Sequence, residues 1–542
     1  MLQFAYRPFA VTLVVALSMV VSAGPAHAAP GSQDPRLIVL APVATGVGPS
    51  IARSPVSDRR GEPTREQPLL LRNGGGHGKP GGGGGTADGA LQTSASVALG
   101  TTAGQSYDGV GVGMGAYRPC CAPPDTNASV GTTQVVQWVN LDYAVFDKVT
   151  GAVTGPFSGN SFWNGFTAGN CNTNNDGDPI IKFDAQAQRW LATQFSVTGG
   201  PPYFQCVAIS SGADILTSTW TQYAYSFGSY FPDYPKLGVW PDAYYMSFNR
   251  FLNGVSFAGA AACAFDRAAM LAGSPTAAGQ CFNNGTNVAS LLPADLDGAT
   301  GAAGSTAAPP AGARNVFANF GSNALNLFKF HVDFANSANS TFTSSSLAVP
   351  AFSTACNGGT CIAQAGTSNQ LDSLADRLMY RLAYRNFGAY ESLVVTHSVM
   401  GSGTAAPRWY ELRSSTGTQD FTTYQASSYA PDATYRWMGS AAMDKLGDLA
   451  IGYSASGTSI SPGIRYTGRL AGDPLNQLRI EQTALSGTGS QTGGLHRWGD
   501  YSSMAVDPSD DCTFWYTTEY LRANGSFNWS TRLVSFKFPG CS

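Results

Sequence analysis

A pattern of short strands recurs along this chain and strongly limits the folds that it can adopt. The two clearest copies begin with RWMG at 436–439 and, 61 residues later, with RWGDY at 497–501. Each copy predicts four short strands, with an aspartate at the turn between the first two. Together the copies predict an all-β fold, a β-propeller of seven four-stranded blades, with six or eight blades as alternatives. Separate β-sandwiches are disfavoured because no linkers divide the units. The other copies occupy 126–160, 178–225, 233–267, 290–335 and 376–413.

The composition agrees with such a fold and excludes other classes of protein. Only 12% of the residues are charged, about half of the ~25% in an average soluble domain. The chain is too apolar to be disordered, and a formal net charge of −3 argues against nucleic acid as a partner. Its 64 glycines and 11% aromatic residues suit short strands joined by tight turns.

The first 95 residues differ from the rest of the chain. Residues 1–28 have the pattern of a secretory signal peptide: Arg7, an apolar stretch at 9–21 and the small-residue cleavage pattern AHA at 26–28. An apolar stretch of 13 residues is too short to span a membrane, so we expect a secreted, extracellular protein with no membrane span. Residues 29–95 are rich in Gly and Pro and predict a disordered linker or propeptide ahead of a propeller domain at 96–542.

Ten cysteines, all after the predicted cleavage point, agree with export to an oxidising compartment. Cys120 and Cys121 are adjacent and have no obvious partner. Ten cysteines allow hundreds of connectivities, so spacing alone does not fix the pairing. The locally favoured pairs are Cys171 with Cys206, Cys263 with Cys281, Cys356 with Cys361, and Cys512 with Cys541.

Several short motifs carry a resemblance to known proteins. They are PPDTN at 123–127, NNDGDP at 174–179, DYPK at 233–236, RLMYRLAYRN at 377–386, RWGDYSSM at 497–504 and the stretch 506–516. On these motifs the chain resembles a family of secreted bacterial proteins, mostly uncharacterised, with sialidase/BNR-like β-propeller folds. The resemblance covers nearly all of 120–541 and implies the fold and export, but no activity. The repeated boxes, arginine triad and Tyr/Glu pair of a true sialidase are missing, apart from a degenerate echo at 214–220.

Charged residues gather at the predicted blade starts. In a propeller the residues just before each innermost strand face the entrance of the axial channel. Carboxylates and guanidinium groups from several blades would therefore converge on one funnel, which suits a sugar or a uronic acid. The alternative is a structural role in which these charges pair neighbouring blades. The residues are Asp178, Asp233, Lys236, Asp376, Arg377, Arg436, Arg497 and Asp500.

Two kinds of carbohydrate chemistry fit such a funnel. A glycoside hydrolase needs two facing carboxyl groups, for which Asp233, Asp376 and Asp500 are the candidates. A polysaccharide lyase needs a Tyr or His base beside a cation, for which Tyr501 and His496 are the candidate bases. A non-catalytic propeller that binds an extracellular glycan or a surface protein is the alternative, and we expect a monomer in each case. The candidate substrate-binding cations are Lys236, Arg377, Arg381, Arg436 and Arg497.

Residues 172–178 have the spacing of a calcium-binding loop. Oxygen ligands stand at alternate positions, Asn172, Asn174, Asp176 and Asp178, with a glycine at 177. The twelfth position of the loop is Phe183, so it is not an EF-hand. The alternative is an Asx-turn loop that satisfies its own backbone. Calcium is the one cofactor that the sequence suggests.

Overall fold

The computed structural model describes residues 34–67, 70, 88–298 and 307–542. The predicted signal peptide and the glycine run at 81–85 lie outside these residues. Strands dominate, and the one α-helix in the described part is α1 (Arg267–Leu271). No helix of the described residues is long and apolar enough to cross a membrane.

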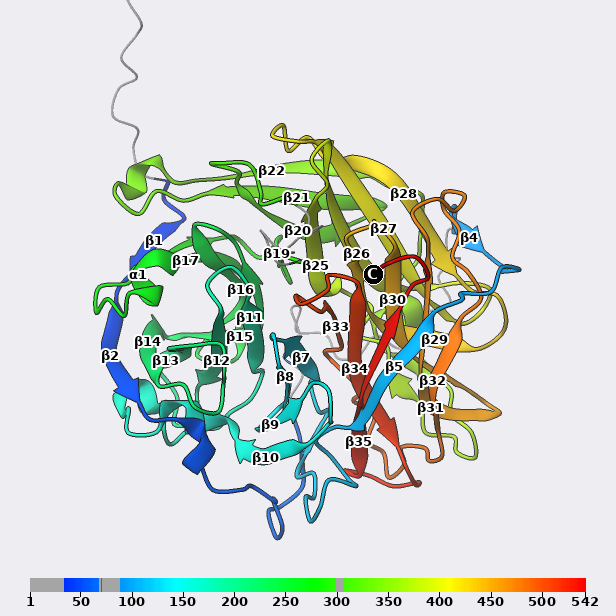
Figure 1. Ribbon diagram of the computed structural model, residues 1–542, viewed down its shortest axis with the longest axis horizontal. Coiled ribbons are helices and arrows are strands. Elements are labelled where there is room, and N and C mark those ends of the chain that lie inside the picture. The colour runs from blue at the N-terminus through cyan, green and yellow to red at the C-terminus, as the bar shows by residue number, and fades with distance from the viewer. Residues whose placement is uncertain (1–33, 68–69, 71–87, 299–306) are drawn as a thin grey trace, which may run out of the picture.

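The strands form a seven-bladed β-propeller, as the repeat predicts. Each blade is an antiparallel sheet, and the nine-stranded sheet holds two blades because β19 and β25 pair in parallel. The innermost strands pack against one another in sequence around the axis, and β33 returns to β7 to complete the ring (Figure 1).

The first four blades follow the chain in simple order. Blade 1 consists of β7 (Asn127–Val130), β8 (Gln134–Val139), β9 (Asp142–Asp147) and β10 (Val153–Ser158). Blade 2 consists of β11 (Ile180–Asp184), β12 (Arg189–Ser196), β13 (Tyr203–Ser210) and β14 (Trp220–Gly228). Blade 3 consists of β15 (Tyr230–Val239), β16 (Ala243–Leu252), β17 (Ser256–Asp266) and β18 (Gly279–Asn283). Blade 4 consists of β19 (Leu292–Leu296), β20 (Asn315–Gly321), β21 (Ala324–His331) and β22 (Thr341–Ala348).

Blades 5 and 6 also follow the chain, whereas blade 7 is completed by a strand from much earlier in the chain. Blade 5 consists of β25 (Met379–Asn386), β26 (Tyr390–Met400), β27 (Ala405–Ser415) and β28 (Thr422–Tyr429). Blade 6 consists of β29 (Tyr435–Met443), β30 (Leu449–Gly457), β31 (Ile460–Arg469) and β32 (Gln482–Gly487). Blade 7 consists of β33 (Ser503–Val506), β34 (Thr513–Leu521) and β35 (Trp529–Lys537), and its outer strand is β5 (Thr102–Asp108). A two-stranded sheet of β23 (Thr360–Ile362) and β24 (Leu371–Asp372) lies between blades 4 and 5 in the chain.

The segment before the propeller domain is partly built into the blades. β1 (Leu37–Leu40) pairs with β18, β2 (Pro42–Gly48) with β14, and β4 (Leu91–Gln92) with β28, so blades 3, 2 and 5 gain an outer fifth strand (Figure 1). The prediction of a disordered linker is therefore wrong for residues 34–67. An outer blade strand presents unpaired N–H and C=O groups, and a short extended segment can pair with them whatever its composition. β3 (Arg65–Glu66) pairs with β6 (Cys121–Ala122).

The blades are held together by apolar packing and by disulfides. Large side chains such as Trp138, Trp190 and Trp409 are fully buried, and burial of such a side chain stabilises the fold by about 1.5–3 kcal/mol or more. The four locally favoured disulfides are confirmed: Cys171–Cys206, Cys263–Cys281, Cys356–Cys361 and Cys512–Cys541. Cys120 and Cys121 remain free and buried.

A residue with a left-handed backbone precedes the regular pairing of every innermost strand. Such a conformation is uncommon outside glycine, so its recurrence in all blades marks one shared turn at the channel entrance. The residues are Asp125, Asp178, Tyr234, Ser290, Leu374, Met438 and Asp500, with φ between 43° and 58°.

Candidate functional site

Charged and aromatic side chains from five blades meet at the entrance of the axial channel. We call this group the mouth cluster. The shared left-handed turn directs Asp125, Asp178 and Asp500 to the same place, because each occupies the turn position of its own blade. These three carboxyl groups interact electrostatically with one another. The cluster consists of Asp125, Asp178, Asp233, Tyr234, Lys236, Arg377, Arg497, Asp500 and Tyr501.

Lys236 occupies the centre of the mouth cluster between two tyrosine rings. Its Nζ lies 3.1 Å from the ring centroid of Tyr234 and 3.6 Å from that of Tyr501. The same Nζ donates to the carbonyl oxygen of Pro235 at 3.0 Å. Burial lowers the pKa of Lys236 well below its ordinary value, although the nearby carboxylate of Asp178 opposes that effect. The amine is therefore a desolvated hydrogen-bond donor held against an aromatic surface.

Three carboxyl groups of the mouth cluster, those of Asp125, Asp178 and Asp233, have raised pKa values. Burial, followed by the negative charge of Asp178, raises the pKa of Asp233 to about 8. Burial also raises the pKa of Asp178, against the charge of Lys236, and raises that of Asp125 well above its ordinary value. Asp233 is half-buried, and its carboxyl group makes no hydrogen bond or ion pair with any described residue. With a pKa of about 8, the carboxyl group of Asp233 is therefore mostly protonated at neutral pH.

Other groups of the mouth cluster are already paired. Arg377 Nε lies 2.7 Å from Asp376 Oδ1, and Arg497 forms an ion pair with Asp500. Arg497 Nη1 also donates to the carbonyl oxygen of Gln67 at 2.5 Å, so the residue after β3 reaches the mouth. Three buried atoms still lack a hydrogen-bond partner among the described residues: Asp125 Oδ1, Asp500 Oδ1 and Arg497 Nε. The cluster thus has two acceptor atoms and one donor that a polar ligand could bind by hydrogen bonds.

Two of the residues predicted for the mouth lie elsewhere. Arg436 is fully buried and binds Glu481 with two contacts of 2.8 Å, and it also pairs with Asp432. His496 is exposed, and its Nδ1 lies 2.7 Å from the carbonyl oxygen of Gln370. Neither residue contacts the mouth cluster among the described residues. Asp376 is 38% exposed in its side chain and contacts the cluster through its ion pair with Arg377.

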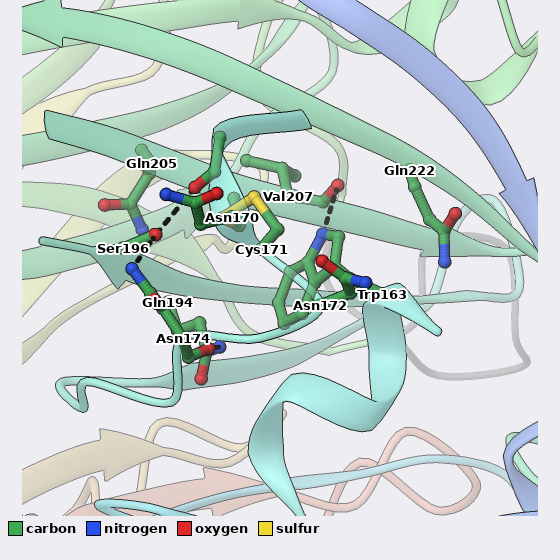
Figure 2. Close-up of a disulfide and its surroundings, with 12 residues drawn as sticks. Trp163, Asn170, Cys171, Asn172, Asn174, Gln194, Ser196, Gln205, Val207 and Gln222 are labelled. Carbon is green, nitrogen blue, oxygen red and sulfur yellow. Dashed lines mark hydrogen bonds between the residues drawn. A yellow bond between two sulfur atoms is a disulfide. The ribbon is translucent and has the colours of Figure 1, made fainter. Parts of the chain in front are cut away.

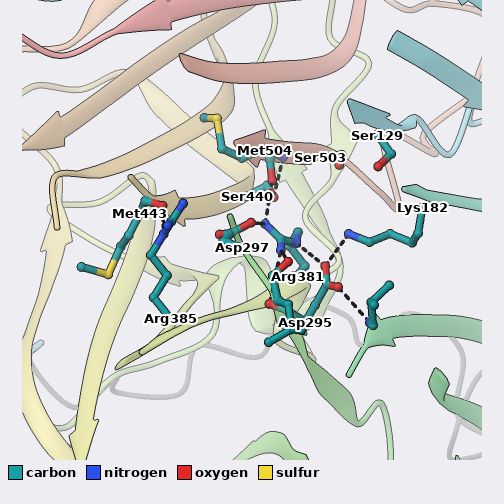
Figure 3. Close-up of polar contacts among 12 residues, drawn as sticks. Ser129, Lys182, Asp295, Asp297, Arg381, Arg385, Ser440, Met443, Ser503 and Met504 are labelled. Carbon is teal, nitrogen blue, oxygen red and sulfur yellow. Dashed lines mark hydrogen bonds and ion pairs between the residues drawn. The ribbon is translucent and has the colours of Figure 1, made fainter. Parts of the chain in front are cut away.

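Arg381 belongs to a second charged group, centred on the innermost strands β11, β19 and β25 (Figure 3). Arg381 Nε lies 2.6 Å from Asp295 Oδ2, and Nη1 lies 2.7 Å from Asp297 Oδ1. Lys182 also pairs with Asp295, which accepts a further hydrogen bond of 3.0 Å from the backbone of Val239. A cavity of about 40 Å³ beside Lys182 and Arg381 is too small for a sugar. This group joins blades 2, 4 and 5, a structural role that differs from the predicted substrate binding.

Two of the predicted calcium ligands, Asn172 and Asn174, lie near the Cys171–Cys206 disulfide (Figure 2). Asp176 Oδ2 accepts hydrogen bonds from the backbone N–H groups of residues 197 and 198, at 2.6 and 2.8 Å. Asn174 Nδ2 donates to Ser196 and to the carbonyl of residue 198, whereas Asp178 faces Tyr501. Within the described ranges no group of three or more His, Cys, Asp or Glu side chains could hold a metal ion. Asn174 and Asp176 thus bind residues 196–198 and not, as the Asx-turn alternative expects, the backbone of their own loop, and calcium binding stays a prediction.

The mouth cluster also contains residues that the sequence reasoning missed. Asp125 and Tyr234 were not among the predicted site residues. Asp125 could have been found, because PPDTN precedes the first blade as NDGDP precedes the second. Tyr234 is adjacent to Asp233, but only the structure shows its ring against Lys236.

Known proteins show only distant similarity to this chain. No family model and no curated protein matches the chain. Among solved structures it is similar to the WD40 domain of SCAP from fission yeast, with 7% identity over 74% of this chain and 81% of that one, at a TM-score of 0.32. It is also similar to an endo-arabinase from Bacteroides thetaiotaomicron, with 16% identity over 53% of this chain and 92% of that one, at a TM-score of 0.26. The resemblance to sialidase/BNR-like proteins is confirmed no further than the propeller fold.

Proposed function

We propose that the protein hydrolyses a glycosidic bond of an extracellular polysaccharide at the mouth cluster. The observation that carries this proposal is the carboxyl group of Asp233, which is half-buried, makes no hydrogen bond or ion pair with a described residue and has a pKa of about 8. A glycoside hydrolase needs one carboxylic acid that donates a proton to the leaving oxygen and a second carboxylate beside it. Asp233 holds its proton at neutral pH and fits the role of the acid. The disulfides support export, since such bonds persist in oxidising compartments.

Asp178 is the proposed second carboxylate. Its negative charge is, after burial, the main cause of the raised pKa of Asp233, so the two groups are close enough to interact strongly. The charges of Lys236 and Arg497 and the Tyr501 hydroxyl, 3.3 Å from Asp178 Oδ2, favour its ionised form. Two acids that interact in this way lose their protons in separate steps, which leaves one neutral and one charged over a range of pH. Asp178 then activates water or attacks the sugar itself.

A lyase mechanism is less well supported. It needs a base that removes a proton next to a uronate, and the sequence candidates for that base were Tyr501 and His496. Burial raises the pKa of Tyr501 well above its ordinary value, so its hydroxyl is a poor base at neutral pH. His496 is exposed and lies outside the mouth cluster. Hydrolysis uses the groups that are actually gathered there.

A non-catalytic glycan-binding propeller is the second candidate. The ion pairs of Arg377 with Asp376 and of Arg497 with Asp500 favour it, because paired charges hold a fixed polar surface for binding. The contact of Gln67 with Arg497 also fills part of the mouth. A binding protein needs no proton donor, so this candidate leaves the raised pKa of Asp233 without a function.

The test is incubation of the purified full chain with a panel of neutral and uronic-acid polysaccharides. We expect new reducing ends from at least one of them, without the ultraviolet absorbance of unsaturated uronates. Asp233→Asn and Asp178→Asn should each abolish product while circular dichroism is unchanged. Asp432→Asn, at a 55% exposed side chain outside the cluster, is the matched control and should stay active. Binding without turnover would favour the second candidate, and neither binding nor turnover would overturn both.

A further inference from the structure

Two cysteines remain outside the disulfides of the structure, and they are neighbours in the chain. Cys120 and Cys121 are both buried, with exposed fractions of 4% and 3%. Their Sγ atoms lie 2.7 Å apart. The other eight cysteines are all paired in disulfides. The two sulfur atoms are thus already in contact, with no other cysteine left to bind.

The pair is covered by β3, and Gln67, directly after β3, contacts Arg497 of the mouth cluster. The carbonyl oxygen of Cys120 accepts from the backbone N–H of Arg65 in β3 at 2.7 Å. The carbonyl oxygen of Cys121 accepts from the indole of Trp529 at 2.6 Å. On the other side the sulfur-bearing residues pack against Leu141. β3 and the core therefore hold both cysteines in place, five and four residues before the turn at Asp125.

The surroundings make one of the two sulfurs the better nucleophile. The hydrogen bond between the two thiols lowers the pKa of Cys121, and the positive charges of Arg65 and Arg59 lower it further. The same hydrogen bond and burial raise the pKa of Cys120. The thiolate is the reactive form of cysteine, so reaction begins at Cys121.

We propose that Cys120 and Cys121 form a redox site, a dithiol that closes into a disulfide between neighbouring residues. The oxidant is a disulfide, either of an exported thiol oxidoreductase or of a small thiol such as glutathione. The Cys121 thiolate attacks one sulfur of that disulfide, which forms a mixed disulfide and releases the other sulfur as a thiolate. Cys120 then loses its proton and attacks Cys121 Sγ, which releases the second thiol. The protein gives up two electrons and two protons, and the oxidant gains them.

This disulfide is more easily reduced than the three with ordinary Cα separations of 5.3–5.9 Å, Cys171–Cys206, Cys356–Cys361 and Cys512–Cys541. Adjacent Cα atoms are about 3.8 Å apart across a trans peptide and closer across a cis one. Most disulfides join Cα atoms about 4.4–6.8 Å apart, and departures from that range strain the bond and favour its reduction. Because β3 covers the pair, oxidation takes place before residues 58–67 settle on β6 or when they open. A labile disulfide at this position reports the redox state of the surroundings, whereas the other four maintain the fold.

The test begins with the full chain purified without reductant, denatured in guanidinium and treated with iodoacetamide. We expect no alkylated cysteine, and a peptide spanning 120–121 that lacks two hydrogens relative to the dithiol. Two alkyl groups on that peptide, or its cross-link to another cysteine, would overturn the proposal.

The second measurement is graded reduction of the native protein at equilibrium, read by alkylation and peptide mapping. The 120–121 pair should open at a dithiothreitol ratio at least about tenfold lower than Cys171–Cys206, Cys356–Cys361 and Cys512–Cys541. Opening together with the others would refute the assigned lability. Cys120→Ser should leave one thiol, at Cys121, and the Cys120→Ser/Cys121→Ser double variant should leave none. If these variants fail to fold, mapping of the wild-type chain still decides between a dithiol and a disulfide.

Discussion

Replacing Asp233 with asparagine should stabilise the protein at neutral pH although it removes the proposed catalytic acid. In the folded state burial raises the pKa of Asp233 from 3.8 to about 8. Between these values the unfolded chain has released the proton that the folded protein keeps. Stability therefore falls as the pH rises from about 4 to about 8, because the unfolded state is favoured by its ionised carboxylate. The variant carries no titrating group at this position, so its stability does not fall with pH for this reason.

The size of the effect follows from the pKa values. Each unit of difference corresponds to about 1.36 kcal/mol, so the gain at pH 7 reaches about 4 kcal/mol, and it shrinks to nearly zero at pH 4. Partial exposure of Asp233 screens the charge, and we expect about 2–4 kcal/mol. For a chain of 542 residues, an unfolding entropy of about 2.1 cal/mol/K per residue converts this to about 2–4 °C in melting temperature.

The assay is urea unfolding followed by tryptophan fluorescence at several values between pH 4 and pH 8. The matched control is Asp295→Asn, because the charges of Arg381 and Lys182 hold the pKa of that buried carboxyl below its ordinary value. Its loss leaves two buried cations without their shared partner and should cost about 3–5 kcal/mol at pH 7, with the deficit shrinking in acid. The reasoning fails if Asp233→Asn is no more stable than wild type at pH 7, or if its gain does not change with pH.

Three further substitutions test the structural assignments. Leu37→Asp places a charge at a buried position of β1 and should destabilise the protein by about 2–4 kcal/mol in urea, whereas a disordered leader would tolerate it. Arg436→Ala should lower stability by about 2–4 kcal/mol, because Glu481 loses a bidentate partner, while the folded fraction keeps the turnover or binding of wild type. Asp176→Ala removes acceptors from two backbone N–H groups and should cost about 1–3 kcal/mol. That loss should be the same with added calcium and with a chelator, and a loss seen only with calcium would point to a bound ion.

The repeat carried enough information to predict the ring and most of the mouth. Equivalent positions of successive blades meet at the axis, which is why Asp178 and Asp500 converge although 322 residues separate them. Arg436 was misplaced because the pairing of β29 with β30 shifts register between Trp437 and Ser440. Met438 therefore takes the turn position in that blade. A register shift depends on backbone contacts, and a strand pattern does not reveal it.

The strands β1 and β2, which precede the propeller domain, could not be predicted from the composition of the segment that contains them. Residues 37–43 form the apolar run LIVLAPV, but charged residues, Gly and Pro follow it up to residue 67, and no alternating pattern marks it as a strand. Pairing with a blade edge uses backbone groups, so it leaves little trace in the side chains. The pKa of Asp233 was equally beyond the sequence, since it depends on burial and on the charge of a residue from another blade.

The outer strand of blade 7 also governs when the ring can close. β5 pairs with β35, and one side-chain contact between them, Arg532 with Asp108, spans 424 residues. The ribosome synthesises β5 long before β35, so β5 has no partner strand until the rest of the chain has been synthesised. Contacts between such distant segments are slow to form, because the loop between them must close first. Pairing of β5 with β35 therefore completes blade 7 only after the whole chain has been synthesised. The same pairing must break before blade 7 can unfold.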